Sequence, residues 1–163
     1  MRFDELPEED ARALLLRCMA APDWVEEVLG GRPYRSVDEL LEVADQAARD
    51  LSEDDLEAAL AGHPRIGERA AAGHNAAASA REQAGVVSTS ATTQKLVEGN
   101  QAYEERFGHV YLVRAAGRSG EQMLALLRAR LGNDDATERD VVRDQLAEIT
   151  SLRLRRLWEE GEV

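Results

Sequence analysis

Leu60-Ala-Gly-His-Pro-Arg-Ile-Gly67, followed by Ser79-Ala-Arg-Glu-Gln-Ala-Gly85, is the stretch that decides how the chain folds around its most reactive side chains. A capping box formed by Ser52 and Asp55 predicts a helix over 53–61, with Gly62 as the residue that ends it. Pro64 disfavours the helical conformation for the residue before it. His63 is therefore predicted on an extended or turn backbone at the exit of a helix, where a chain can present a reactive group.

The alanine-rich run 68–84 predicts a second helix, interrupted near Gly73. Ser79, Glu82 and Gln83 are spaced i, i+3 and i+4, so they share one face of this helix. That face offers a hydroxyl, a carboxylate and an amide to the same neighbour. A histidine beside such a face predicts a site for a small polar molecule. A plain helix stop at His63-Pro64 and a capping box at Ser79 remain alternatives.

Helical spacing of apolar residues recurs through most of the 163 residues, and only 4% of residues are aromatic. The length fits one domain over residues 1–163. His109-Val-Tyr-Leu-Val113 is β-branched and aromatic, so it is predicted to be extended, with no partner strand elsewhere. The sequence thus predicts an all-α, single-domain bundle of about seven to nine helices with one extended connector near 109–115.

Helix boundaries follow from capping residues and prolines. Pro22 is expected to stop the first long helix, with a short turn from Trp24 to Leu29 after it. The later helices are expected to begin at Ser36, Ser52, residue 68, Ser88 or Ser90, Ser119 and Thr137. Three of these starts fit capping boxes, formed by Ser36 with Glu39, Ser52 with Asp55 and Ser119 with Gln122.

The charge of the chain excludes several classes of partner. A formal net charge of −12 repels phosphate backbones and anionic membranes, so neither nucleic acid nor a membrane is expected as a partner. An anionic substrate would need arginines gathered locally; the candidates are Arg65, Arg81, Arg118 and Arg153. The single Cys18 excludes an internal disulfide and fits a reducing cytoplasm, and its helical context predicts a buried apolar role.

Three ordered segments carry a resemblance to a known family: Gly62-His-Pro-Arg-Ile-Gly67, Ser79-Ala-Arg-Glu-Gln-Ala-Gly85, and the run 100–119 that begins Asn-Gln-Ala-Tyr and ends Ala-Gly-Arg-Ser. Trp24, the Gly31–Ser36 turn, Arg128-Ala-Arg-Leu-Gly-Asn133 and the Leu152-Arg-Leu run also fit. In this order the segments resemble the 2-oxo-4-hydroxy-4-carboxy-5-ureidoimidazoline (OHCU) decarboxylases, from about Phe3 to Leu157. Each motif is weak alone, but the combination is specific.

The resemblance implies a carboxy-lyase that converts OHCU to (S)-allantoin in urate degradation, without metal or organic cofactor and commonly as a homodimer. It implies His63 as proton donor with Glu82 as its acidic partner, and Arg153, or secondly Arg118, as the arginine that binds the substrate. The substrate-binding wall implied is Pro64, Ser79, Ala80, Arg81, Glu82 and Gln83, with the connector Tyr111, Leu112, Val113, Arg114 and Ala115 binding through its backbone.

One position departs from the family pattern. Many members read Phe-Gly-Phe where this chain reads Phe107-Gly-His109. A polar ring here either alters the lining of the pocket or points outward, and we assign His109 no catalytic role.

Two other functions stay open from the sequence. His63, His74 and Glu68 could bind zinc in a hydrolase, although their spacing fits no metal motif. The acidic, amphipathic helices would also suffice for a non-catalytic interaction module. Arg153, Arg155 and Arg156 could then merely complement the dipole of the last helix. Activity that survives chelation would exclude the first function, and binding of allantoin-like molecules would exclude the second.

Overall fold

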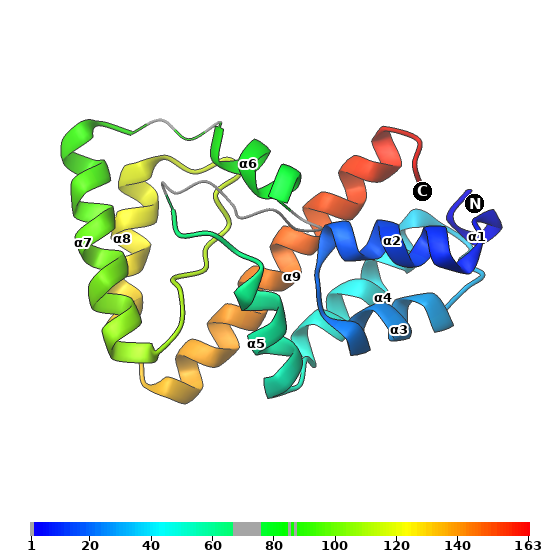
Figure 1. Cartoon of the computed structure of the whole chain (residues 1–163), viewed down its shortest axis with the longest axis horizontal. Helices are drawn as coiled ribbons and strands as arrows, with labels where there is room; N and C mark the ends of the chain where they lie inside the picture. The colour runs from blue at the N-terminus through cyan, green and yellow to red at the C-terminus, as the bar shows by residue number, and fades with distance from the viewer. Residues whose placement is uncertain (1, 67–75, 85, 87) are drawn as a thin grey trace.

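Nine α-helices make up the part of the chain that the computed structural model describes, residues 2–66, 76–84, 86 and 88–163, and no strand occurs in that part (Figure 1). The predicted all-α class is confirmed. The helices are α1 (Arg2–Glu5), α2 (Glu8–Cys18), α3 (Pro22–Gly30), α4 (Val37–Arg49), α5 (Glu53–Ala61), α6 (Ala76–Ala84), α7 (Ser90–Phe107), α8 (Gly120–Arg130) and α9 (Asp135–Glu159). None of these helices is both long enough and apolar enough to span a bilayer.

Two hydrophobic clusters form the core. The larger contains buried residues of α1 to α5 and of α9, among them Trp24, Leu40 and Leu146. The smaller contains residues of α7, α8 and the segment between them, among them Tyr103 and Leu127. Figure 1 shows α7 and α8 together on one side, α1 to α4 on the other, and α9 running from one group to the other. The long α9 therefore links the two parts of the bundle.

The expected connector joins α7 to α8 and runs between this helix pair and α5 in Figure 1. Gly108, at φ 78°, ends α7 in the left-handed conformation that glycine adopts without strain. Residues 109–115 then form neither helix nor strand. Their backbone is instead held by side chains: Arg130 Nη1 donates to Leu112 O at 2.6 Å, and Arg114 N donates to Gln145 Oε1 at 2.9 Å. Helices on both sides thus supply the hydrogen bonds that a partner strand would supply.

The predicted turn from Trp24 to Leu29 is wrong, because these residues lie in α3. The first long helix, α2, ends at Cys18, four positions before Pro22. Pro22 is the first residue of α3. Proline is tolerated there because the first helical N–H groups have no intrahelical acceptor. Asp55 Oδ2 accepts a hydrogen bond from Asp23 N at 2.9 Å and so satisfies one of these groups.

The capping predictions differ in outcome. The Ser119–Gln122 box is reciprocal, as expected. Ser36 and Ser52 cap α4 and α5 with their hydroxyls, but the carboxylates that would complete their boxes bind Arg35 and Asp23 instead. α7 begins at Ser90, as expected, with Thr89 as its cap. α9 begins earlier than expected, at Asp135, with Asp134 as its cap. The short α1 was not expected from the sequence.

Candidate functional site

A small pocket lies where the exit of α5, the helix α6, the connector and α9 converge. We call it the His63 pocket. It holds about 310 Å³ of empty space, part of it open to solvent. Its lining residues are His63, Pro64, Ile66, Ser79, Glu82, Gln83, Tyr111, Leu112, Val113, Ala115 and Ile149. The structure therefore brings together most of the residues that the sequence resemblance singles out, from segments far apart in the chain.

His63 stands at the exit of α5, as predicted. Gly62 follows the last helical residue in a right-handed conformation, and His63 N donates to Leu60 O at 3.1 Å. The ring lies half-buried beside the guanidinium of Arg153. Burial, and after it the positive charge of Arg153, lowers the pKa of His63 to about 3. The imidazole of the free protein is therefore neutral near physiological pH, with one nitrogen able to donate a proton and the other able to accept one.

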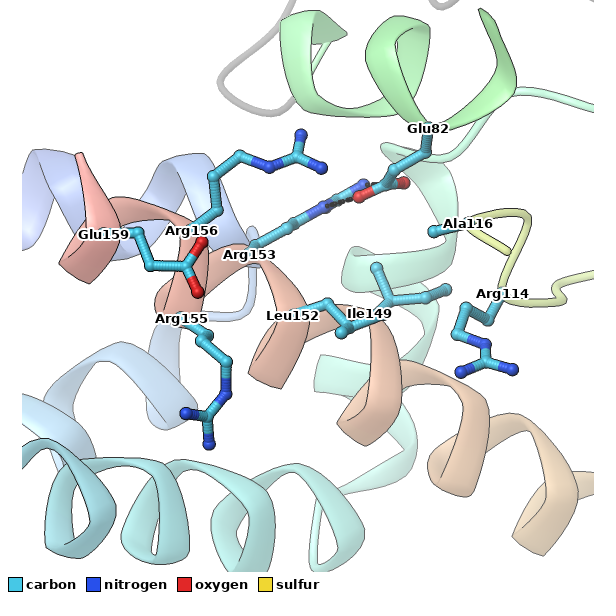
Figure 2. Close-up of a pocket in the computed structure, with 9 residues that line it drawn as sticks. All are labelled: Glu82, Arg114, Ala116, Ile149, Leu152, Arg153, Arg155, Arg156 and Glu159. Atoms are coloured by element: carbon cyan, nitrogen blue, oxygen red, sulfur yellow. Dashed lines mark hydrogen bonds and ion pairs between the residues drawn. The ribbon is translucent and has the colours of Figure 1, made fainter. Parts of the chain in front are cut away.

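Glu82 and Arg153 form the central ion pair of the site, and Figure 2 shows their side chains pointing toward each other from α6 and α9. Arg153 Nε donates to Glu82 Oε1 at 2.7 Å and Nη2 donates to Oε2 at 3.0 Å. The side chain of Arg153 is only 5% exposed and that of Glu82 14%. Such a two-bond, largely desolvated contact fixes both side chains. The alternative role of Arg153, complementing the helix dipole, does not describe this geometry.

The remaining hydrogen bonds of Arg153 tie α9 to two other elements. Nη1 donates to Cys18 O at 2.9 Å, and Nη2 donates to Ser79 Oγ at 3.1 Å. Four of the hydrogen bonds that a guanidinium can donate are thus committed within the protein. Cys18 itself is a buried free thiol whose pKa is raised by burial to about 12, which fits the apolar role predicted for it.

Arg118, the second arginine considered for substrate binding, is also committed. Its Nη1 donates to Gln145 Oε1 at 3.0 Å and to Arg114 O at 3.2 Å. Gln145 also accepts a hydrogen bond from the backbone N–H of Arg114. Arg118 therefore helps to hold the connector and does not line the His63 pocket. Both arginines considered for the substrate carboxylate therefore have partners inside the protein.

Five of the residues singled out for substrate binding do not line the His63 pocket: Ala80, Arg81, Arg114, Arg118 and Arg153. Ala80 and Arg81 are exposed on other faces of α6, and Arg81 pairs with Glu160 at 3.3 Å. Conversely, Ile66 and Ile149 line the pocket without having been predicted. Ile66 lies two positions after Pro64, within the same quoted motif, so its proximity to His63 could have been noticed. Ile149 lies 67 positions beyond Glu82, and no local pattern connects the two.

His109 lies outside the His63 pocket, in a hollow that also contains Phe107, Glu57 and Arg139. Its ring makes an edge contact with Tyr103, with 5.5 Å between the ring centroids, and a tilted contact with Phe107 at 6.3 Å. The imidazole thus occupies an aromatic cluster beside the start of the connector. A polar ring in place of an apolar one is accommodated there without entering the pocket.

The zinc alternative falls partly outside the described residues, because Glu68 and His74 lie between 67 and 75. Within the described ranges, no group of three or more histidine, cysteine, aspartate or glutamate side chains is arranged to hold a metal ion.

The comparison with protein families identifies the chain's relatives. The sequence model of the family described as OHCU decarboxylase matches residues 4–155 of the chain. The chain belongs to the OHCU decarboxylase family. A 2-oxo-4-hydroxy-4-carboxy-5-ureidoimidazoline decarboxylase of Haloferax volcanii is 31% identical over 138 residues, which are 80% of this chain and 79% of that protein. A uric acid degradation bifunctional protein of Arabidopsis thaliana is 25% identical over 146 residues, 86% of the chain; the chain spans 45% of its length.

Two solved structures share the fold of this family member. A crystal structure of OHCU decarboxylase in the presence of (S)-allantoin superposes with a TM-score of 0.74 at 22% identity, covering 87% of this chain and 94% of that one. A crystal structure of (S)-allantoin synthase superposes with a TM-score of 0.71 at 16% identity, covering 94% of this chain and 51% of that one.

Proposed function

We propose that this member of the OHCU decarboxylase family removes CO₂ from OHCU and forms (S)-allantoin, a step of urate degradation in purine catabolism. The observation that carries the proposal is the convergence of His63, Glu82 and the connector on one pocket. A titratable ring, a carboxylate and a stretch of extended backbone are the groups that a small polar heterocycle with amide edges requires.

The chemistry explains why so few groups suffice. The ring carbon C4 of OHCU carries both the hydroxyl and the carboxylate, and C5 belongs to a C=N bond. When the bond from C4 to the carboxylate breaks, its electron pair forms a C4=C5 bond, and the C=N pair moves to nitrogen, which takes up a proton from water. The hydroxyl then loses its proton as C4 becomes a carbonyl, and C5 gains a proton on one face. The C=N bond is the electron sink, so the reaction needs no metal or organic cofactor.

His63 is our candidate for the last proton transfer. Because its pKa is lowered to about 3, the ring enters the reaction neutral. A neutral imidazole can accept the hydroxyl proton at one nitrogen and deliver a proton to C5, so it acts as a proton donor only after it has acted as an acceptor. Delivery from one fixed side chain accounts for a single enantiomer of the product.

Glu82 and Arg153 act as one unit in this proposal. The Glu82 carboxylate accepts two hydrogen bonds from Arg153, which leaves lone pairs for the hydroxyl or ureido N–H groups of the substrate. Arg153 holds Glu82 and Ser79 in place. It does so without offering a free two-pronged face, because four of its five N–H groups already donate within the protein.

The connector supplies the opposite wall. Tyr111, Leu112, Val113 and Ala115 line the pocket from an extended segment, so their backbone N–H and C=O groups can bind the amide-like edges of the ring. The side chains of Leu112 and Val113 are buried, which keeps that wall fixed while substrate enters and product leaves.

We further infer that residues 1–163 act as one OHCU decarboxylase-like domain, in the cytoplasm and as a homodimer. The free, buried Cys18 supports a reducing compartment, and the family resemblance supports the dimer. Light scattering of the purified protein tests the dimer directly: a mass near twice 18.0 kDa is expected, and a mass near 18.0 kDa would exclude it.

The proposal is tested with freshly generated product of urate oxidation and hydrolysis. The purified protein should accelerate its decay and give dextrorotatory allantoin, whereas spontaneous decay gives a racemate. His63→Asn should remove the acceleration while circular dichroism shows an unchanged helix content. Wild-type turnover in this variant would remove His63 from the mechanism, and a racemic product with wild-type protein would contradict the proposed function.

A further inference from the structure

Next to the His63 pocket lies a second hollow whose polar lining consists mainly of arginines (Figure 2). We call it the vestibule. Its arginines are Arg114, Arg153, Arg155 and Arg156, and its carboxylates are Glu82 and Glu159. This local excess of positive charge stands out in a chain whose formal net charge is −12.

The vestibule and the His63 pocket share two residues, Glu82 and Ile149. The connector also contributes to both, since Ala115 lines the pocket while its neighbours Arg114 and Ala116 line the vestibule. The two hollows therefore lie against the same wall. A substrate that approaches the pocket from this side meets the vestibule first.

The arginines of the vestibule differ in how they are paired. Arg153 is neutralised by Glu82. Arg114 forms an ion pair with Glu148, with 3.5 Å between Nε and Oε2. Arg155 and Arg156 form no ion pair with any residue that the structure describes. Arg155 is exposed and Arg156 half-buried, and Figure 2 shows them leaving α9 on the two sides of Glu159. Their charges are available to an incoming anion, whereas those deeper in the site are committed.

An apolar surface lies between the charged groups. Leu152 is 41% exposed and, with Ile149, forms the floor of the vestibule. A flat five-membered ring with a carboxylate on one side matches such a surface, because the ring can cover Leu152 while the carboxylate faces a guanidinium.

We propose that the vestibule collects anions, and that Arg155 and Arg156 attract the substrate carboxylate and raise its concentration at the mouth of the His63 pocket. The identity of the anion rests on the proposed function, whereas the existence of the anion site does not. It assigns the first contact with the carboxylate to arginines outside the pocket, while Arg153 and Arg118 hold protein groups in place.

The double substitution Arg155→Gln and Arg156→Gln tests the proposal by steady-state kinetics at increasing NaCl. At low salt each removed charge should cost roughly threefold in kcat/KM, so the double variant should lose about tenfold, mostly through a higher KM. For the wild-type protein kcat/KM should fall as salt approaches about 0.2 M, where the screening length shrinks below ~10 Å; for the double variant it should change little.

Arg128→Gln is the matched control, because Arg128 is exposed on α8 and lines neither the vestibule nor the His63 pocket. It removes a positive charge and should keep the wild-type KM and salt dependence. Equal KM and equal salt dependence in the double variant and the wild-type protein would overturn the proposal. A change in oligomeric state of the double variant would also overturn it, since the vestibule would then be covered by a second copy.

A binding measurement separates this inference from the proposed function. Sulfate at millimolar concentration should raise the thermal unfolding midpoint of the wild-type protein and of Arg128→Gln. The midpoint of the double variant should rise much less. If the wild-type protein fails to turn over OHCU and sulfate still discriminates the variants, the proposed function is wrong and the anion site stands. If turnover is normal and neither sulfate nor kinetics discriminates them, the anion site is wrong.

Discussion

At the scale of single residues, the proposed role of His63 predicts how the reaction depends on pH. Its pKa is lowered to about 3 by burial and by Arg153, so the neutral form is present throughout the neutral range. If the neutral ring starts the reaction, kcat/KM should be constant from about pH 5 to about pH 8 and should fall only near the lowered pKa. A kcat/KM that decreases as pH rises through about 6.5 would show that the protonated ring is required instead.

The same shift predicts how stability depends on pH. The unfolded chain holds His63 at its ordinary pKa of 6.5, whereas the folded protein favours the neutral ring with a pKa of about 3. Between these values the unfolded state binds more protons, so the free energy of unfolding decreases as pH falls through this window and is fully restored above it. His63→Asn should remove this part of the dependence. Thermal unfolding midpoints at a series of pH values measure it.

Glu82→Gln tests the ion pair at the centre of the site. The amide keeps the shape but leaves Arg153 largely buried without its negative partner, which should cost about 3 kcal/mol of stability. Loss of the carboxylate should also lower kcat/KM at least about a hundredfold, measured on protein shown to be folded. Ser79→Ala, which removes one weaker bond to Arg153, should cost only about 1 kcal/mol. An unchanged kcat/KM in Glu82→Gln would reduce Glu82 to a structural role.

At the scale of elements, the connector depends on a buried charge from another helix. Arg130 of α8 donates to Leu112 O and pairs with Glu138 of α9, whose side chain is 0% exposed. Tyr103 and Asn133 also donate to that carboxylate. This network fixes the pocket wall without touching the pocket, so it is a positioning device.

Arg130→Lys should separate positioning from folding. Lysine keeps the charge opposite Glu138 but cannot reach Leu112 O with the same planar fork, so KM should rise several-fold while kcat changes little. Arg130→Met, which leaves Glu138 buried and unpaired, should cost about 3–5 kcal/mol of stability. Arg128→Lys is the exposed control. An unchanged KM in Arg130→Lys would show that the connector holds its shape without this bond.

The elements also show which structure could be predicted locally. Caps and apolar spacing indicated most helices, because both signals lie within a few residues of each other. Two helices were not predicted: the short α1, and α3, where Pro22 follows one helix and begins the next, and a proline permits either structure. The pairing of Arg153 with Glu82 could not be predicted from spacing, since the two residues are 71 positions apart and meet only in the folded chain.

At the scale of the whole molecule, the ordered motifs predicted which segments of the chain meet at the His63 pocket. The resemblance indicated most residues of the His63 pocket, because each motif marks one wall: the α5 exit, α6 and the connector. The resemblance could not predict which arginines are available to bind an anion, because this depends on hydrogen bonds between distant segments. Arg153 and Arg118 proved to be committed, whereas Arg155 and Arg156, first read as complements of a helix dipole, line the vestibule.

The most direct test of the whole account is polarimetry on freshly generated OHCU with the wild-type protein and with His63→Asn at equal concentration. We expect rapid appearance of positive optical rotation with the wild-type protein and only slow, racemic decay with the variant. Equal rates and equal rotation in the two reactions would contradict the claim that His63 delivers the proton that fixes the configuration of allantoin.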